Sequence, residues 1–394
     1  MSGRCKYLGQ LVIQHDWQEA MRNNEKAWLS SVIEGQPSIY GELSPVSKAG
    51  GRELKTTDGF EAEYVGKNIK IKFHNICSNF HHPLSTFSNI HTKAVRCLDV
   101  SPGGGLAISC DDDGLFIWQT DNGNIRRSLN GHVSDVTQCR FFPSGVVALT
   151  GGVDMTLRIW STEDGSCPVI LTGHKGAITC TEIVDKGRNI ISCSRDGSAM
   201  LWDCGTSSCL GTLKTCASAI NSCCMIQYKM SVENETSNRS ERECGTNGKL
   251  LVIGREDGVL DAVDVFNRKT IFSYHCESAV NSCCFVGDTS LAAGSNNGCI
   301  NFFDLRNTKL PYKIRKYGKS SVNCLKEYHT DNLLVGRGDG TTSCISTKED
   351  CESVTYELTG PDCDPIYSLS THTNCVYTAC RDKRIRKYKL EFNT

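Results

Sequence analysis

The chain has 394 residues, of which 22% are charged, and its 43 Lys and Arg against 44 Asp and Glu leave a net charge of −1. This balance excludes a general attraction to nucleic acid or to anionic membranes, and no apolar run approaches the roughly 20 residues that a membrane-spanning helix needs. The first residues, MSGRCKYLGQLVIQHDW, lack the apolar core of a secretory signal. We therefore expect the protein in the cytoplasm, with the nucleus as a second location.

The first predicted element is a helix over residues 17–30, WQEAMRNNEKAWLS, with Asp16 as its N-cap. Its partial apolar face consists of Trp17, Ala20, Met21, Ala27 and Trp28. KNIKIKFHN, residues 67–75, then alternates apolar and polar residues as a strand does. We therefore predict that residues 1–82 form a small N-terminal α/β extension that packs against the rest of the chain.

A group of metal-compatible side chains follows in FHNICSNFHH: His74, Cys77, His81 and His82. Zinc sites usually combine such a cluster with a second pair of ligands elsewhere, and no second pair stands out. The 24 cysteines contain no Cys-x-x-Cys pair, and many lie in apolar strand patterns such as AINSCCMI, where a reduced thiol acts as a small buried hydrophobe. We expect no metal, no cofactor and no disulfide framework.

From residue 83 to residue 394, one strand pattern recurs seven times: a β-branched residue, two spacers and then alternating apolar positions. It begins at Val95, Val136, Ile178, Ile220, Val280, Val322 and Ile366. The interval is about 42 residues, with one of about 60, and such a period indicates the blades of a WD-repeat propeller. The long interval contains the polar residues 228–247, which we interpret as a loop inserted in the fourth blade.

Two further positions recur in phase with these strands. Tight turns that tolerate positive φ are expected at Asp113, Asp154, Asp196, Asp257, Asn297, Asp339 and Asp382. After the turn comes the tryptophan position of the third strand, which holds Trp160, Trp202 and, in a first blade that is one residue short, Trp118. The sequence therefore predicts an all-β fold, a seven-bladed WD-repeat β-propeller over residues 83–394.

The last blade has room for only three strands before residue 394, so its outermost strand must come from elsewhere. Residues 84–90, LSTFSNI, precede His91, which occupies the same register as His132 and His174. We predict that residues 84–90 supply the missing strand and close the ring, which protects strand edges that would otherwise invite aggregation.

Two sets of residues have the side-chain types of a hydrolase triad, since each contains a histidine, a hydroxyl and a carboxylate. The sets are His132, Thr150 and Asp154 with Trp160, and His174, Ser192 and Asp196 with Trp202. Their repetition from blade to blade favours buried structural hydrogen-bond networks over a catalytic site. We therefore expect a protein that is not an enzyme.

Two charged stretches are candidates for binding. The acidic turns are expected on the face that carries the loops between blades, where they would attract a basic partner, unless aspartate is there only because it suits turns. Their residues are Asp111, Asp112, Asp113, Glu256 and Asp257. The basic segment RDKRIRKYK, 381–389, allows a nuclear-localisation or nucleic-acid patch, but its register favours a strand of the last blade.

Several stretches are more specific than a generic propeller: HDWQEA, TFSNIHTKAVRCLDVS, GHVSDVTQCRFFPSG, DKGRNIISCSRDGSAMLWDCG and ELTGPDCDPIY. In this order they resemble the proteasomal ATPase-associated factor family, most strongly over residues 85–215. The resemblance implies a chaperone of proteasome regulatory-particle assembly. Such a chaperone binds the C-terminal region of one proteasomal ATPase subunit and opposes its premature association with the core particle.

No contact residue of that family carries over to this chain, and we expect a free monomer that binds neither nucleic acid nor membrane. Two other functions stay open. A different WD-repeat scaffold, such as a ubiquitin-ligase substrate receptor, would also use a propeller, but it would need an adaptor-binding motif that we do not recognise in residues 1–80. An RNA- or chromatin-associated propeller has only the basic segment to support it.

Overall fold

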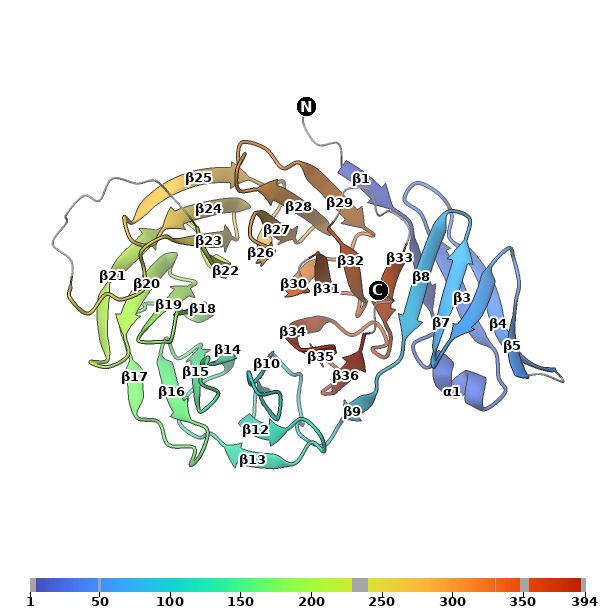
Figure 1. Cartoon of the computed structure of the whole chain (residues 1–394), viewed down its shortest axis with the longest axis horizontal. Helices are drawn as coiled ribbons and strands as arrows, with labels where there is room; N and C mark the ends of the chain where they lie inside the picture. The colour runs from blue at the N-terminus through green and yellow to red at the C-terminus, as the bar shows by residue number, and fades with distance from the viewer. Residues whose placement is uncertain (1–4, 49–50, 229–239, 330, 348–353, 391–394) are drawn as a thin grey trace.

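The computed structural model of the chain describes residues 5–48, 51–228, 240–329, 331–347 and 354–390. Their strands form a ring of small sheets around a central axis, with a second group of strands beside the ring (Figure 1). No helix in these ranges is long and apolar enough to cross a membrane. The WD-type β-propeller predicted from the repeats is confirmed.

The first three blades are antiparallel sheets of four consecutive strands, with the first strand nearest the axis (Figure 1). Blade 1 contains β10 (Cys97–Val100), β11 (Leu106–Cys110), β12 (Leu115–Gln119) and β13 (Ile125–Ser128). Blade 2 contains β14 (Val136–Phe141), β15 (Val147–Gly152), β16 (Leu157–Ser161) and β17 (Val169–Leu171). Blade 3 contains β18 (Ile178–Val184), β19 (Asn189–Ser194), β20 (Ser198–Asp203) and β21 (Ser208–Thr215).

The next two blades repeat this order. Blade 4 contains β22 (Ile220–Gln227), β23 (Lys249–Arg255), β24 (Val259–Asp264) and β25 (Lys269–His275). Blade 5 contains β26 (Val280–Val286), β27 (Ser290–Ser295), β28 (Cys299–Asp304) and β29 (Lys313–Tyr317). The predicted insertion 228–247 falls between β22 and β23; its residues 229–239 lie outside the described ones, and residues 240–248 contain no strand.

The last two blades complete the ring. Blade 6 contains β30 (Val322–Tyr328), β31 (Asn332–Arg337), β32 (Thr342–Ser346) and β33 (Val354–Leu358). Blade 7 contains β34 (Ile366–His372), β35 (Cys375–Cys380), β36 (Ile385–Lys389) and, as its fourth strand, β9 (Ser85–Phe87). Because β9 pairs antiparallel with β36, with Phe87 opposite Ile385, the predicted closure of the ring by residues 84–90 is confirmed.

The periodic residues of the sequence form the core between blades. The residues that begin the repeats, from Val95 to Ile366, are all buried. In blades 2 to 7 the register between the first and second strands shifts directly after this residue. This recurring β-bulge increases the local twist of the inner strands, and the sequence pattern alone did not predict it.

The N-terminal residues form a β-rich module beside blades 5 and 6. β1 (Cys5–Leu8) pairs in parallel with β29 of blade 5. β2 (Gln10–Ile13), β3 (Ala27–Val32), β4 (Ile39–Lys48) and β5 (Gly51–Thr56) form an antiparallel sheet. β6 (Glu61–Val65), β7 (Asn68–Phe73) and β8 (Ile76–His81) extend blade 6, because β8 pairs in parallel with β33.

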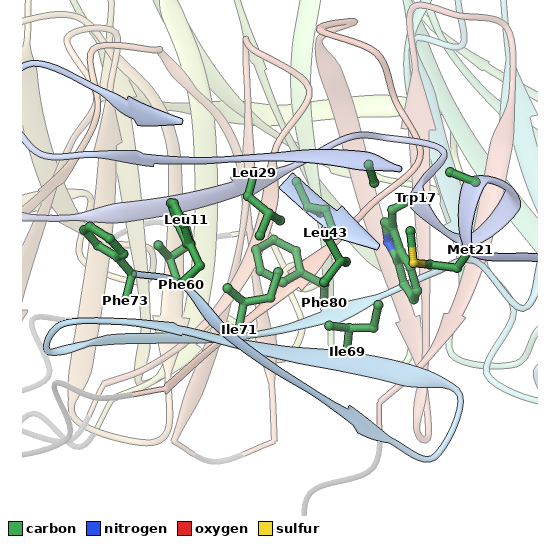
Figure 2. Close-up of a cluster of buried hydrophobic side chains, with 13 residues drawn as sticks. Leu11, Trp17, Met21, Leu29, Leu43, Phe60, Ile69, Ile71, Phe73 and Phe80 are labelled. Carbon is green, nitrogen blue, oxygen red and sulfur yellow. The ribbon is translucent and has the colours of Figure 1, made fainter. Parts of the chain in front are cut away.

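Apolar side chains from the two N-terminal sheets pack on each other, among them Leu29, Leu43, Ile71 and Phe80 (Figure 2). The module is also tied to the propeller by Trp17, whose buried indole Nε1 donates a hydrogen bond to Thr359 Oγ1 over 3.0 Å. Strand pairing with blades 5 and 6 and this side-chain hydrogen bond therefore attach the module to the propeller.

The predicted helix over residues 17–30 is wrong beyond its first turns, because α1 spans only Trp17–Arg22. Asn24 adopts a positive φ of 62°, and the segment after it forms β3, paired with β2 and β4. The side chain of Asp16 makes no cap hydrogen bond. Strand pairing with distant segments outweighed the weak apolar pattern, so the extension is mainly β rather than α/β.

Candidate docking surface

The first predicted network lies inside blade 2. His132 Nδ1 lies 2.8 Å from Asp154 Oδ2, and its Nε2 lies 2.7 Å from Thr150 Oγ1. Trp160 Nε1 donates a hydrogen bond to the same hydroxyl over 2.8 Å. Thr150 is 0% exposed, so this hydroxyl has no access to a substrate. The network links strands within the blade to the loop that enters it, and its polar groups satisfy one another.

Blade 3 repeats the arrangement. His174 lies 3.0 Å from Asp196 and 2.7 Å from the Ser192 hydroxyl, which also accepts a hydrogen bond from Trp202. Burial raises the pKa of Asp196, but hydrogen bonds from Ser198, from backbone N–H groups and from His174 outweigh it and hold that pKa at about 2. The carboxylate is therefore stabilised in its charged form by the folded state.

This depressed pKa gives the network a pH-dependent effect on stability. A carboxyl whose folded pKa lies below its unfolded value of about 3.9 stabilises the protein above that value, and the contribution is lost as pH falls toward the folded pKa. We expect Asp196→Asn to lower the unfolding midpoint at pH 7 and to reduce the loss of stability between about pH 5 and pH 3. Denaturant unfolding across this range, with the exposed Asp121→Asn as control, tests this; an unchanged pH profile in Asp196→Asn would contradict it.

The corresponding network of blade 1 uses Asp111, one of the predicted docking residues. His91 Nε2 lies 2.7 Å from Ser109 Oγ, and His91 Nδ1 lies 3.4 Å from Asp111. The Asp111 carboxylate also accepts hydrogen bonds from the backbone N–H groups of Thr92 and Lys93, and its side chain is 1% exposed. The Asp111 carboxylate is therefore enclosed by the blade, which argues against the prediction that it contacts a partner.

The other two acidic residues of blade 1 are more accessible, but each has a basic neighbour. Asp113 lies 2.7 Å from Lys93 Nζ, and Asp112 lies 3.2 Å from Arg96 Nε. The hydrogen bond with Lys93 is the main cause that lowers the pKa of Asp113. The negative charge of this turn is therefore largely balanced within the blade.

The acidic turn of blade 4 is similar. Asp257 forms an ion pair with Arg255, and Glu256 accepts a hydrogen bond of 2.8 Å from Asn221 Nδ2. Blades 1 and 4 lie in different parts of the ring (Figure 1), so the two acidic turns do not form one continuous patch. In five blades the turn aspartate accepts a hydrogen bond from the backbone N–H two residues later, which is the role that aspartate commonly has in turns. These residues are Asp154, Asp196, Asp257, Asp339 and Asp382.

The basic segment 381–389 ends in β36 (Ile385–Lys389), so the last-blade strand that its register predicts is found over residues 385–389. Arg386 is buried, forms an ion pair with Asp382 and donates a hydrogen bond to Gly360 O over 3.1 Å. Lys387 Nζ lies 5.5 Å from the centre of the Tyr377 ring. Arg386 and Lys387 are thus engaged in contacts within the propeller, which argues against a nucleic-acid patch on this segment.

The four metal-compatible residues of the N-terminal module do not gather. His74 occupies the turn between β7 and β8, and Cys77 lies in β8. His82 Nδ1 lies 2.9 Å from the carbonyl oxygen of Pro83. Among the residues that the structure describes, His74, Cys77, His81 and His82 do not form a group of closely spaced donor atoms.

A groove of ≈ 80 Å³ lies where the N-terminal module meets the loops of blades 6 and 7. We call it the joint groove. Leu11, Ile13 and Trp28 line it from the N-terminal module, and residues 339–341 and 359–363 line it from the propeller. It is much smaller than the roughly 300 Å³ of typical small-molecule pockets, so it suits a side chain of a protein partner better than a free ligand.

The rim of the joint groove continues on β3 and β4, where apolar side chains are exposed beside Glu42, the residue paired with Trp28. Trp28 is 45% exposed and Tyr40 is 68% exposed, and Tyr40 pairs with Ser30, two residues from Trp28. Val32, on the same face of β3, is also exposed. Exposed Trp and Tyr side chains beside a groove are typical of sites where a protein partner binds.

Sequence reasoning missed this surface because it placed Trp28 in a helix. Read as a strand, WLSSV carries Trp28, Ser30 and Val32 on one face, so the alternation was present in the sequence. The contribution of residues 359–363 had no local signal, because that loop follows Trp28 by more than 300 residues.

Comparisons with known proteins cover both the ring and the N-terminal module. The WD domain, G-beta repeat family matches residues 82–119, 123–161, 165–203 and 266–304. The chain is 45% identical over 389 residues to "Proteasomal ATPase-associated factor 1" of Homo sapiens, which covers 96% of this chain and 98% of that protein. It is 35% identical over 420 residues to "Probable proteasomal ATPase-associated factor 1" of Dictyostelium discoideum, covering 98% of this chain and 97% of that protein.

Proposed function

The chain belongs to the proteasomal ATPase-associated factor 1 family, and we propose from this that it binds a proteasomal ATPase subunit and acts as an assembly chaperone of the proteasome regulatory particle. The observation that supports the proposal most is the extent of the likeness, which includes the N-terminal module as well as the propeller. In this proposal the chain is a cytoplasmic monomer when free and has no catalytic role.

We place the contact on the C-terminal region of one ATPase subunit. A closed ring of sheets whose strands also pair with the attached module offers a preformed surface, and a protein that covers a small domain excludes other partners from the same surface. Bound in this way, the chain holds the subunit in an assembly intermediate and opposes its association with the core particle. Release follows when a competing interface forms.

The joint groove is the contact that we propose for that subunit. Its apolar rim offers Trp28 and Tyr40, the residue types that dominate binding energy at protein interfaces. Asp362, whose carboxylate lies 3.7 Å from His15 Nδ1 and whose side chain is 71% exposed, adds a negative charge beside the groove, which favours a partner with a basic residue near an apolar one. Asp112, Asp113, Glu256 and Asp257 remain a second candidate contact, but each has a partner inside the propeller.

The function is tested by binding of the full chain to the isolated C-terminal domain of each proteasomal ATPase subunit in turn. We expect saturable binding to one of these domains and none to the others, because a specific interface discriminates between related surfaces. Calorimetry on the purified components measures this. Absence of binding to every domain, or equal weak binding to all, would contradict the proposal and favour a WD-repeat scaffold with a different partner.

A further inference from the structure

Three buried cysteines meet between blades 3 and 4. Cys180 comes from β18, Cys193 from β19, and Cys223 from β22 of the next blade. Their Sγ atoms all lie within 4.8 Å of one another, and each residue is at most 7% exposed. Among the residues that the structure describes, no other three His, Cys, Asp or Glu residues have donor atoms that all lie within 4.8 Å of one another.

The position of Cys193 departs from the pattern of the propeller. Cys193 pairs with Cys180 directly after the β-bulge. The same position in five other blades holds Gly151, Gly254, Gly294, Gly336 and Ala379. The residue there is small because the neighbouring blade packs on it: a Cβ at Gly151 would lie 2.5 Å from Ile178 Cγ2. Cys193 therefore places a sulfur atom where these five blades have only a hydrogen or a methyl group.

Blade 1 shows the same departure with the same companions. Cys110 occupies the corresponding position and pairs with Cys97, and Cys139 comes from the next blade. Cys97 Sγ lies 2.9 Å from Cys110 Sγ and 3.0 Å from Cys139 Sγ. In both blades where the small residue is replaced, the replacement is cysteine. Its strand partner is also a cysteine, and a third cysteine comes from the first strand of the next blade. Among the described residues, however, only Cys180, Cys193 and Cys223 bring all three sulfurs within 4.8 Å of one another.

Three sulfur donors select a thiophilic cation. Thiolates favour Zn²⁺ and Cu(I) over hard cations such as Mg²⁺. A tetrahedral Zn²⁺ with Zn–S bonds of about 2.3 Å places its sulfurs ~3.8 Å apart, so sulfurs that lie within 4.8 Å of one another need shifts of only about 1 Å to bind it. Three thiolates with Zn²⁺ carry a net charge of −1 instead of the −2 left with Cu(I), and the smaller charge is less costly to bury.

The fourth coordination position of such an ion would face the central cavity of the propeller. Cys180 and Cys223 both line the central cavity of the propeller, which has a volume of ≈ 590 Å³ and is bordered mainly by polar side chains. This cavity would give a cation access to the sulfurs and would supply a water molecule as the fourth ligand, as in zinc sites with three protein ligands.

We propose that Cys180, Cys193 and Cys223 bind one Zn²⁺ ion through their three sulfur atoms, with the fourth coordination position facing the central cavity. Because the ligands come from two blades, the ion links blade 3 to blade 4 beside the chain segment that leads into residues 228–247. This inference is independent of the proposed contact with an ATPase subunit.

The site is tested with Co²⁺ as a spectroscopic probe in the reduced full chain. We expect a near-ultraviolet sulfur-to-Co²⁺ charge-transfer band that Zn²⁺ abolishes by displacement. Cys193→Ala should lose this band, and the variant should fold because Ala379 occupies the same position in blade 7. Cys223→Ala removes a second ligand independently, and Cys344→Ala, a buried cysteine of blade 6, is the matched control that should keep the band.

The outcomes separate clearly. No charge-transfer band in the wild-type chain, or an unchanged band in both Cys193→Ala and Cys223→Ala, would overturn the proposal. A band that is lost in Cys110→Ala but kept in Cys193→Ala would place the metal in blade 1 and would overturn it as well. Zn²⁺ should also raise the melting temperature of the wild type and of Cys344→Ala, and leave that of Cys193→Ala unchanged.

Discussion

Replacing Phe87 with alanine is expected to lower the free energy of unfolding by about 3–5 kcal/mol, the usual effect of truncating a buried phenylalanine. β9, to which Phe87 belongs, is the strand that joins the beginning of the propeller to its end. Phe87 is buried, and its ring centroid lies 4.8 Å from that of Trp118 in blade 1. Its loss therefore leaves a cavity at the junction of blades 7 and 1, where the ring closes.

Thr86→Ala is the matched control for this prediction. Thr86 lies in the same strand, opposite Arg386, but its side chain is exposed. We expect a change within about 0.5 kcal/mol, because exposed substitutions away from special contacts have small effects. Urea unfolding of the three proteins at pH 7 measures both. If Phe87→Ala and Thr86→Ala shift the midpoint equally, the side chain of Phe87 does not hold the ring closed.

The propeller was predictable from the sequence because its buried residues and turns recur at a fixed interval. Buried positions such as Val136 and Ile178 recur at the spacing of one blade, and each blade needs only its neighbours to bury them. The closing strand was predictable for the same reason, since three strands after Ile366 leave one position unfilled. Strand alternation around Ile69 and Ile71 was likewise sufficient to place β7.

The N-terminal module was not predictable in the same way, because its partners are distant in the sequence. β8 pairs with β33, so the neighbours of Cys77 are residues near Val354. No local pattern carries that information, and the segment after Asn24 was assigned to a helix from a weak apolar face. The joint groove depends on both elements and therefore first appears in the folded chain.

The acidic turns show why a charged motif does not by itself define a surface. Asp111, Asp112 and Asp113 are consecutive, yet Asp111 is enclosed by His91 and two backbone N–H groups while Asp113 remains half exposed. In blade 1 the network carboxylate, Asp111, lies two residues after Ser109, whereas in blade 2 Asp154 lies four residues after Thr150. Only the hydrogen-bond partners distinguish the three residues.

Replacing Trp28 with alanine is expected to weaken binding of the ATPase subunit domain by at least about 30-fold, the loss that corresponds to truncating a residue worth about 2 kcal/mol at an interface. Trp28 lines the joint groove and is 45% exposed, so it offers a large apolar surface for the partner to bury. The same exposure means that its removal leaves little or no cavity in the free protein. We therefore expect a loss of affinity without a comparable loss of stability.

Leu310→Ala is the matched control for Trp28→Ala. Leu310 is also an apolar residue, 50% exposed, and it lies between β28 and β29 and does not line the joint groove. A reduction in affinity that Leu310→Ala reproduces would indicate a general surface effect. Thermal unfolding of both variants shows whether the fold is retained, which is needed to assign any loss of binding to the groove.

The most direct measurement is the dissociation constant of the complex between the full chain and the subunit domain that it selects. It is determined by calorimetry for the wild type, for Trp28→Ala, for Leu310→Ala, and for a variant in which Asp112, Asp113, Glu256 and Asp257 are changed to lysine. We expect Trp28→Ala to bind at least about 30-fold more weakly, and Leu310→Ala and the lysine variant to stay close to the wild type. Unchanged binding by Trp28→Ala, together with loss of binding by the folded lysine variant, would contradict the joint groove as the contact and assign it to the acidic turns.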